Sequence, residues 1–205
     1  MACYRAEVAE VAHRQEIPEQ LASLVLYDAD STEYRLGDLW AEKPVVLVHL
    51  RHFGCILCRH YAGALRDFYG DFEARGAHLV AIGTGGRSYA REFIDERKIP
   101  YLVLIDRHMA SHEVVRIDEG KWWDIFRPGN VWGAIKAFFA GERQGKTGPN
   151  PFKYGAAHVI APDGRVLYAW LNTDYHDNAP VEALLGAASA AREQPLPIAA
   201  APLPA

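Results

Sequence analysis

Cys55 and Cys58 have the spacing of a redox or metal-binding pair, and they are the residues of this chain best suited to chemistry. They follow an apolar run over residues 45–50 that predicts a buried strand, and we expect an amphipathic helix to begin at Cys58. The positive end of a helix dipole stabilises a thiolate, and Arg51 and Arg59 add positive charge on either side. The pattern therefore predicts a reactive thiol.

Two thiols this close together can carry out redox chemistry. One thiolate attacks a substrate, and the second thiol resolves the mixed product by closing a disulfide. A peroxide can also oxidise the thiolate to a sulfenic acid, which then condenses with its neighbour. The alternative is a pair of buried, unreactive thiols, which the C-x-x-C spacing at a strand-to-helix junction makes the less favoured interpretation.

Histidines around the pair raise a second possibility, a metal site. Thiolates and imidazoles together are good ligands for zinc or copper. Strand alternation, however, places His49 and His52 on opposite faces, which argues against convergence on one ion. We therefore favour no metal and no required cofactor, and we keep copper or zinc as the alternative. Its ligands would be His49, His52, Cys55, Cys58 and His60.

The elements around the pair alternate between strand and helix. Helical spacing continues over residues 57–72, residues 78–83 and 101–105 predict strands, and residues 88–98 predict a helix. This alternation predicts an α/β layer fold with parallel, right-handed crossovers. In such a sheet, ligands lie beyond the carboxyl ends of the strands, so Thr84 and Asp106 are expected to border the site.

The second half of the chain breaks this rhythm. Residues 120–154 read as a helical and loop insertion that covers something, with Trp122 and Trp123 as its core, a lid or an exposed partner surface. Tyr154 ends the insertion and is expected beside the active-site strand. A hairpin follows, with strands at 158–161 and 166–170 around an Asp-Gly turn.

Three segments complete the expected organisation. We expect a helical extension over residues 1–20, one domain over 21–192 and a disordered tail rich in proline and alanine over 193–205. Within the domain, we expect a short strand at 24–27, a helical turn at 36–40 and a terminal helix at 180–192.

Composition limits the classes of partner. A chain of 205 residues that is 50% hydrophobic can form one full-sized core. The formal charge of −4 argues against nucleic-acid and membrane partners. The first residues do not have the plan of a signal peptide, and three cysteines are too few for a disulfide scaffold, so we expect a cytoplasmic protein.

Four segments together resemble the peroxiredoxin-like branch of the alkyl hydroperoxide reductase/thiol-specific antioxidant family, over about residues 20–190. They are residues 51–59, 81–83, 99–101 and 161–168. The resemblance implies a thioredoxin-like fold, in which a central mixed sheet has helices on both faces, with the insertion at 120–154 added. It also implies thiol-based reduction of peroxides or disulfides, including organic endoperoxides. The electron donor would be thioredoxin or a low-molecular-weight thiol, and a homodimer is one option.

The resemblance also orders the roles of the two cysteines. A typical peroxiredoxin carries P-x-x-x-T-x-x-C, and its reactive cysteine falls on Cys58, its threonine on Cys55 and its proline on Arg51. We therefore expect Cys58 to be the nucleophile, Cys55 the resolving thiol and Arg51 the group that stabilises negative charge. Arg59, His52, Thr84, Asp106 and Tyr154 would support them or bind substrate.

Two departures from the family pattern narrow the expected substrate. The second arginine of peroxiredoxins falls on Gly155, and the cis-proline of thioredoxins falls on Ala156 or Ala157. We therefore expect an organic peroxide, an endoperoxide or another small molecule as substrate, and a tailoring role in small-molecule biosynthesis is compatible with this. A metal carrier or metal-dependent oxidase, and a redox-silent binding module with the tryptophans as its partner surface, are the alternatives.

Overall fold

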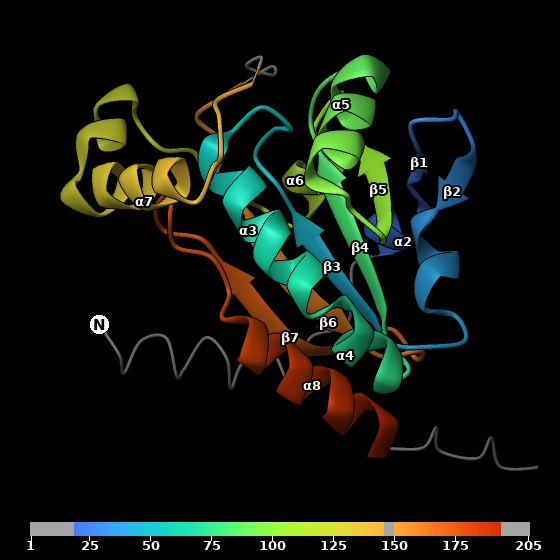
Figure 1. The fold of residues 1–205 in the computed structure, drawn as a ribbon. Coiled ribbons are helices and arrows are strands. Elements are labelled where there is room, and N and C mark those ends of the chain that lie inside the picture. Colours follow the sequence, from blue (N-terminus) through green and yellow to red (C-terminus); the bar gives the residue numbers. More distant parts are fainter. Residues whose placement is uncertain (1–18, 146–149, 194–205) are drawn as a thin grey trace, which may run out of the picture.

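The fold is built on one seven-stranded mixed sheet, which the computed structural model describes within residues 19–145 and 150–193 (Figure 1). The strand order is β2-β1-β5-β4-β3-β6-β7. The three central strands are parallel: β3 (Val45–His49), β4 (His78–Gly83) and β5 (Leu102–Ile105). The outer strands pair antiparallel: β1 (Val25–Tyr27), β2 (Glu33–Arg35), β6 (Ala156–Ile160) and β7 (Val166–Leu171).

Helices cover both faces of the sheet. One face packs against α3 (Ile56–Asp67), α4 (Tyr69–Ala74), α5 (Arg87–Arg97) and α8 (Val181–Glu193). The other face packs against α2 (Glu19–Ser23), the 3-10 helix η1 (Leu36–Trp40) and α6 (Ala110–Val114). Every residue of β3 is buried, because this central strand is covered on both sides. Alternation sends Val46 and Val48 toward α3 and Val45 and Leu47 toward the other face.

The insertion is closed at its base by backbone pairing. The amide of Gly120 donates to the carbonyl of Phe152 at 2.8 Å, and the amide of Tyr154 donates to the carbonyl of Asp118 at 2.9 Å. Between these ends lie the 3-10 helix η2 (Trp122–Phe126) and α7 (Pro128–Phe139). In Figure 1 this segment, drawn in yellow, stands out at one end of the molecule beside the start of α3. The insertion therefore lies close to the start of the helix that follows the cysteine pair.

The expected fold class is confirmed, because a mixed sheet lies between two helical layers. The expected strands at 45–50, 78–83 and 101–105 and the 158–170 hairpin are present, with small shifts at their ends. Strand β2 and helix α6 were not expected from the sequence. No helix in the described part of the chain is both long and apolar enough to span a bilayer.

The structure differs from the sequence prediction at the start of the helix that carries Cys58, and it does not test the predicted limits of the domain. The helix at the cysteine pair begins at Ile56 and not at Cys58, and it is interrupted at Phe68, where α3 gives way to α4. The expected extension over 1–20 lies outside the described residues except for Glu19 and Gln20. The expected tail over 193–205 lies outside them beyond Glu193, so the proposed domain limits stay predictions.

Candidate active site

Cys55 caps the helix that carries Cys58. Its backbone is extended (φ −69°, ψ 122°), and its sulfur accepts a hydrogen bond from the backbone amide of Cys58 at 3.3 Å. The guanidinium of Arg51 donates a second hydrogen bond to the same sulfur at 2.7 Å. An N-cap residue is where a helix offers unpaired amides, so a negative charge on the Cys55 sulfur is stabilised by the helix and by the arginine.

The two thiols differ in how readily each one loses its proton. Burial raises the pKa of the Cys55 thiol, but the hydrogen bond from Cys58 and the charge of Arg51 outweigh burial and hold that pKa well below its ordinary value. The hydrogen bond to Cys55, followed by burial, raises the pKa of Cys58 well above its ordinary value. Of the two thiols, Cys55 is therefore the one that ionises more readily.

Arg51 is held in place beside the pair. Burial opposes its charge, but the negative charges of Cys55 and Cys58 raise the pKa of its guanidinium above the ordinary value. Its guanidinium carbon lies 4.2 Å from the centroid of the Tyr175 ring, a cation–π arrangement. Below it, the Thr84 hydroxyl donates to the Arg51 carbonyl at 2.7 Å. The structure thus places Arg51 at the expected position and gives Thr84 the role of fixing its backbone.

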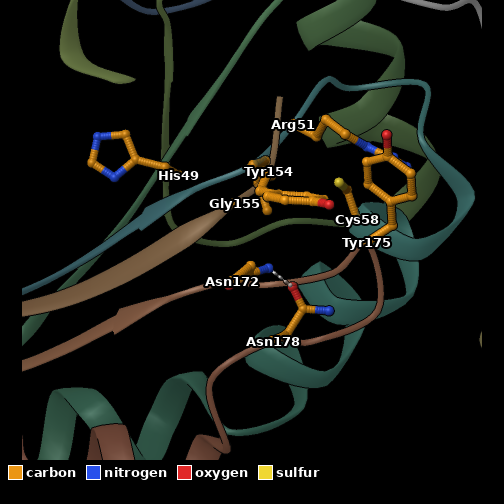
Figure 2. Close-up of a pocket in the computed structure, with 9 residues that line it drawn as sticks. His49, Arg51, Cys58, Tyr154, Gly155, Asn172, Tyr175 and Asn178 are labelled. Atoms are coloured by element: carbon orange, nitrogen blue, oxygen red, sulfur yellow. Dashed lines mark hydrogen bonds between the residues drawn. The ribbon is translucent and has the colours of Figure 1, made fainter. Parts of the chain in front are cut away.

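A small pocket opens over Cys58 (Figure 2). Its free volume is about 10 Å³, which is room for about one water molecule, and it is partly open to solvent. Cys58 is 8% exposed and lines it, whereas Cys55 is fully buried and does not. The pocket is lined by His49, Leu50, Arg51, Cys58, Tyr154, Gly155, Asn172, Tyr175 and Asn178. The surroundings of Cys55 thus favour its ionisation, whereas Cys58 is the sulfur that a substrate in the pocket can reach.

Two tyrosine rings form the aromatic wall of this pocket. The rings of Tyr154 and Tyr175 lie 5.1 Å apart, and in Figure 2 both lie beside Cys58. Residues of the insertion hold their hydroxyls: Tyr154 donates to the Asp124 carboxylate at 3.3 Å, and Tyr175 donates to the Lys121 carbonyl at 3.4 Å. Burial and the Asp124 charge raise the pKa of Tyr154 to about 12, so its hydroxyl stays protonated at neutral pH.

Tyr154 was expected at the site from the sequence, and Tyr175 was not. Tyr175 follows β7, at a distance along the chain from every motif, so no local pattern could have identified it. Asn172 and Asn178 were missed for the same reason; they hydrogen-bond to each other at 3.2 Å across the loop after β7. The pocket therefore depends on the loop after β7, which carries no recognisable sequence motif.

Arg59 does not support the thiolate as expected. It is 3% exposed and forms ion pairs with Glu96 on α5 and, at 4.0 Å, with Glu142. Glu142 is itself buried and pairs with Arg97 at 2.6 Å. Arg59 is one position past Cys58 on the helix, which turns its side chain toward α5. Its charge is therefore neutralised in a network that fastens the insertion to α3 and α5.

Asp106 also lies away from the pair. Its carboxylate accepts from the Ala110 amide at 3.0 Å and from the Ser111 amide and hydroxyl at 2.8 and 2.6 Å. Burial raises the pKa of this carboxyl, but hydrogen bonds from His112 and Ser111 outweigh burial, so the net effect is a pKa below the ordinary value. Asp106 follows a central strand as expected, but its carboxylate holds the first turn of α6 and is not among the residues that line the pocket.

The five residues of the alternative metal site do not converge. His49 points to the opposite face of the sheet, where its ring lies 5.1 Å from His112 and 5.8 Å from His158 (Figure 2 shows it turned away from the pocket). His60 is exposed on α3, and only His52 lies against the cysteines, where burial lowers its pKa. Among the described residues, no group of three or more side chains is arranged to hold a metal ion.

Comparison with known proteins identifies relatives. A family model described as AhpC/TSA family matches residues 15–168. The chain is 27% identical to the thioredoxin-like protein AAED1, chloroplastic, of Arabidopsis thaliana, with 84% of this chain and 73% of that protein covered. It is 30% identical to the prostamide/prostaglandin F synthase of Sus scrofa, with 74% and 77% covered.

Solved structures agree on the fold. The peroxidoxin BcpB of Mycobacterium tuberculosis superposes with a TM-score of 0.62 at 21% identity, covering 86% of this chain and 98% of that chain. A mutant of peroxiredoxin 6 of Arenicola marina superposes with a TM-score of 0.65 at 14% identity, covering 87% and 74%. At such low identity these likenesses show the thioredoxin-like fold alone.

Proposed function

Because the chain belongs to the AhpC/TSA family, we propose that this peroxiredoxin-like thiol oxidoreductase reduces an organic peroxide or endoperoxide with Cys55 and Cys58. One observation carries the proposal: the sulfur of Cys55, which accepts a hydrogen bond from Arg51, lies next to a thiol that faces a pocket. Peroxide reduction needs a thiolate that becomes a sulfenic acid and a thiol that resolves it, and such a pair can supply both; peroxiredoxin chemistry needs no cofactor. The aromatic wall of the pocket and the relatives named prostamide/prostaglandin F synthase support an organic substrate.

We propose that Cys58 is the sulfur that attacks. The substrate must reach the nucleophile from the pocket, and Cys58 lines the pocket whereas Cys55 is fully buried. A proton within a hydrogen-bonded pair can move between the two sulfurs, so the easier ionisation of Cys55 is compatible with attack by Cys58. Cys55 then serves first as the proton acceptor and afterwards as the resolving thiol.

The proposed reaction balances in two steps. Cys58 passes its proton to Cys55 and attacks one peroxide oxygen; an S–O bond forms, the O–O bond breaks, and the leaving alkoxide takes the proton from Cys55. The Cys55 thiolate then attacks the Cys58 sulfur, so that an S–S bond forms and hydroxide or a second alkoxide leaves and is protonated by solvent. Two electrons have passed to the peroxide.

The disulfide must then be reduced. Members of this family reduce peroxides with thioredoxin-type reductants and often dimerise. We propose thioredoxin or a low-molecular-weight thiol as the electron donor, and a homodimer remains one proposed state. A tailoring role in small-molecule biosynthesis and a cytoplasmic location also remain proposals; the relative from Arabidopsis thaliana is named as chloroplastic.

Thiol oxidation followed by mass spectrometry tests the proposal. Reduced protein in a Cys3→Ser background is treated with hydrogen peroxide, an organic hydroperoxide or an endoperoxide. We expect the organic substrates to close the Cys55–Cys58 disulfide fastest. We expect Cys55→Ser to stop at an oxidised Cys58, and Cys58→Ser to react no faster than an ordinary thiol. Wild-type oxidation at that ordinary rate would overturn the function, and rapid oxidation of Cys58→Ser would transfer the nucleophile to Cys55.

A further inference from the structure

The insertion exposes a large set of apolar side chains. Nine of them, between 40% and 83% exposed, lie on η2 and α7. We call them the aromatic face: Trp122, Trp123, Ile125, Phe126, Val131, Trp132, Ile135, Phe138 and Phe139. Scattered exposed apolar residues are ordinary in a soluble protein, but nine large ones on two successive short elements are a concentration that indicates an interaction site. In Figure 1 its two elements stand clear of the sheet, at one end of the molecule.

Helix α7 packs against the protein through its small residues and exposes its large ones. Gly133 lies against α3 so closely that an added Cβ would be 3.2 Å from the Leu57 side chain, and Ala137 is fully buried. On the opposite side, residues 131, 135, 138 and 139 recur at the spacing of one helical face. This is the reverse of an ordinary surface helix, whose large apolar side chains face the core. The exposed face therefore needs an occupant outside this fold.

The charges around the aromatic face have one sign. From residue 121 to residue 144, every exposed charged side chain is cationic: Lys121, Arg127, Lys136 and Arg143. The two acidic residues of this stretch, Asp124 and Glu142, are buried and paired with arginines. The stretch thus carries a formal charge of +2 in a chain whose formal charge is −4. A partner of this face is expected to be anionic.

Three of these cations lie over aromatic rings. Lys121 is 5.2 Å from the Trp123 ring, Lys136 is 5.7 Å from the Trp132 ring, and Arg143 is 4.5 Å from the Phe138 ring. None of the three forms an ion pair within the part of the chain that the structure describes. Arg143 also donates hydrogen bonds to the carbonyls of Phe138 and Glu142. Aromatic rings beside cations that have no acidic partner match the boundary between acyl chains and headgroups of a membrane.

We propose that the aromatic face binds the surface of an anionic membrane, with its rings at the headgroup boundary and its cations on acidic lipids. A second copy of the chain fits less well, because a two-fold contact would place this cationic surface against itself. Lysine is also depleted in protein–protein interfaces, whereas membrane-surface helices are rich in it. The overall negative charge of the chain argues against a membrane partner, but the local positive charge of this face favours an anionic membrane.

Binding there would bring the pocket to the membrane. Lys121 and Asp124, which lie within or beside η2, hold the hydroxyls of the pocket tyrosines Tyr175 and Tyr154. The segment that would contact lipid thus also forms the back of the pocket wall, so an apolar peroxide could pass from the bilayer to Cys58. The membrane proposal itself rests on the exposed surface and not on the reaction.

Vesicle flotation of the full chain tests the inference. We expect binding to vesicles of about three parts phosphatidylcholine to one part phosphatidylglycerol, weak binding to phosphatidylcholine alone, and release at about 0.5 M salt. Trp132→Ser combined with Phe139→Ser should weaken binding about tenfold or more, because two large apolar side chains no longer enter the boundary. Tyr27→Ser, which removes an aromatic ring 45% exposed on β1, is the matched control and should bind as wild type does.

A charge variant and a self-association measurement complete the test. Lys136→Glu combined with Arg143→Glu should remove the preference for phosphatidylglycerol. Reduction of a water-soluble hydroperoxide should be unchanged in both double variants, so failure of the lipid proposal is distinguishable from failure of the reaction. No binding to anionic vesicles would overturn the inference, as would a micromolar dimer in analytical ultracentrifugation that the Trp132 and Phe139 changes dissociate.

Discussion

Cys55 and Cys58 differ in chemical character although they are alike in sequence. Cys55 is the N-cap and accepts from Arg51 and from the Cys58 amide, whereas Cys58 lies inside the first turn and faces the pocket. The sulfur that ionises more readily is therefore not the sulfur that meets the substrate. A proton shared between the two sulfurs reconciles these two properties, and this sharing can be tested.

Removing Cys55 should change the ionisation of Cys58. The hydrogen bond to Cys55 and the Cys55 charge both raise the pKa of Cys58, so Cys55→Ser should lower it and leave Arg51 to stabilise a Cys58 thiolate. The measurement is the rate of iodoacetamide alkylation against pH, with Cys58→Ser as the matched variant. Alkylation of Cys58 in Cys55→Ser should begin at lower pH than in wild type; an unchanged profile would show that the thiols are not coupled.

Tyr175 should matter through its ring and not through its hydroxyl. The ring lies 4.2 Å from the guanidinium of Arg51, whereas the hydroxyl makes only a long hydrogen bond of 3.4 Å. We expect Tyr175→Ala to lower kcat/KM for an organic hydroperoxide by up to about tenfold, and Tyr175→Phe to stay near wild type. Equal losses in both variants would instead assign the effect to the hydroxyl.

At the scale of elements, the start of α3 and the edge of β6 define the site. The helix begins at Ile56 because the Cys55 sulfur takes one free amide and the Gln144 side chain takes another, that of Ile56, at 3.1 Å. The amide of Gly145 then donates to the Gly54 carbonyl at 2.8 Å. The end of the insertion thus lies over the first turn of α3, where Cys55 is buried.

Gly155 allows β6 to approach β3 closely. A Cβ at this position would lie 2.8 Å from the His49 carbonyl oxygen, and a backbone atom cannot move aside as a flexible side chain can. We expect Gly155→Ala to lower the free energy of unfolding by about 1–3 kcal/mol, measured by urea denaturation.

A helical glycine provides the control for that substitution. Gly186 on α8 has open space around an added Cβ, so Gly186→Ala should raise the free energy of unfolding by about 0.5–1 kcal/mol. If both substitutions have the same sign, the close approach of β6 to β3 is not what requires glycine at 155.

At the scale of the whole molecule, three elements bring buried histidines together behind the site. His49 on β3, His112 on α6 and His158 on β6 are buried, and both ring nitrogens of His49 lack a hydrogen-bond partner among the described residues. Burial lowers the pKa of His49 well below its ordinary value and that of His158 from 6.5 to about 4. The folded state therefore holds both side chains neutral.

Acid should weaken the fold through these histidines. The unfolded chain takes up a proton near pH 6.5 and the folded chain does so at lower pH, so the stability is present above pH 6.5 and is lost as the pH falls. His158 alone should account for about 3 kcal/mol by pH 4. Urea denaturation against pH should show a smaller loss for His158→Leu than for wild type; exposed His60→Gln is the control. Equal losses in all three proteins would contradict this account.

The whole molecule also has a charge distribution that composition does not reveal. The formal charge of −4 is an average, while the exposed charges of residues 121–144 are all positive. Helix α7 contributes because its small residues face α3 and its large ones face outward. The tryptophans of the insertion, expected as core, lid or exposed surface, are exposed.

The sequence by itself determined the cysteine pair, the neighbouring Arg51, the central strands and the fold class. These follow from spacing and periodicity along the chain, which local geometry translates directly into strands and helices. Only the tertiary structure decided which sulfur ionises more readily, that Arg59 forms ion pairs with Glu96 and Glu142 and does not reach the thiols, and that Tyr175 completes the pocket. The physical reason is distance: electrostatic and packing energies depend on atoms a few ångströms apart in space, and those atoms come from segments far apart in sequence.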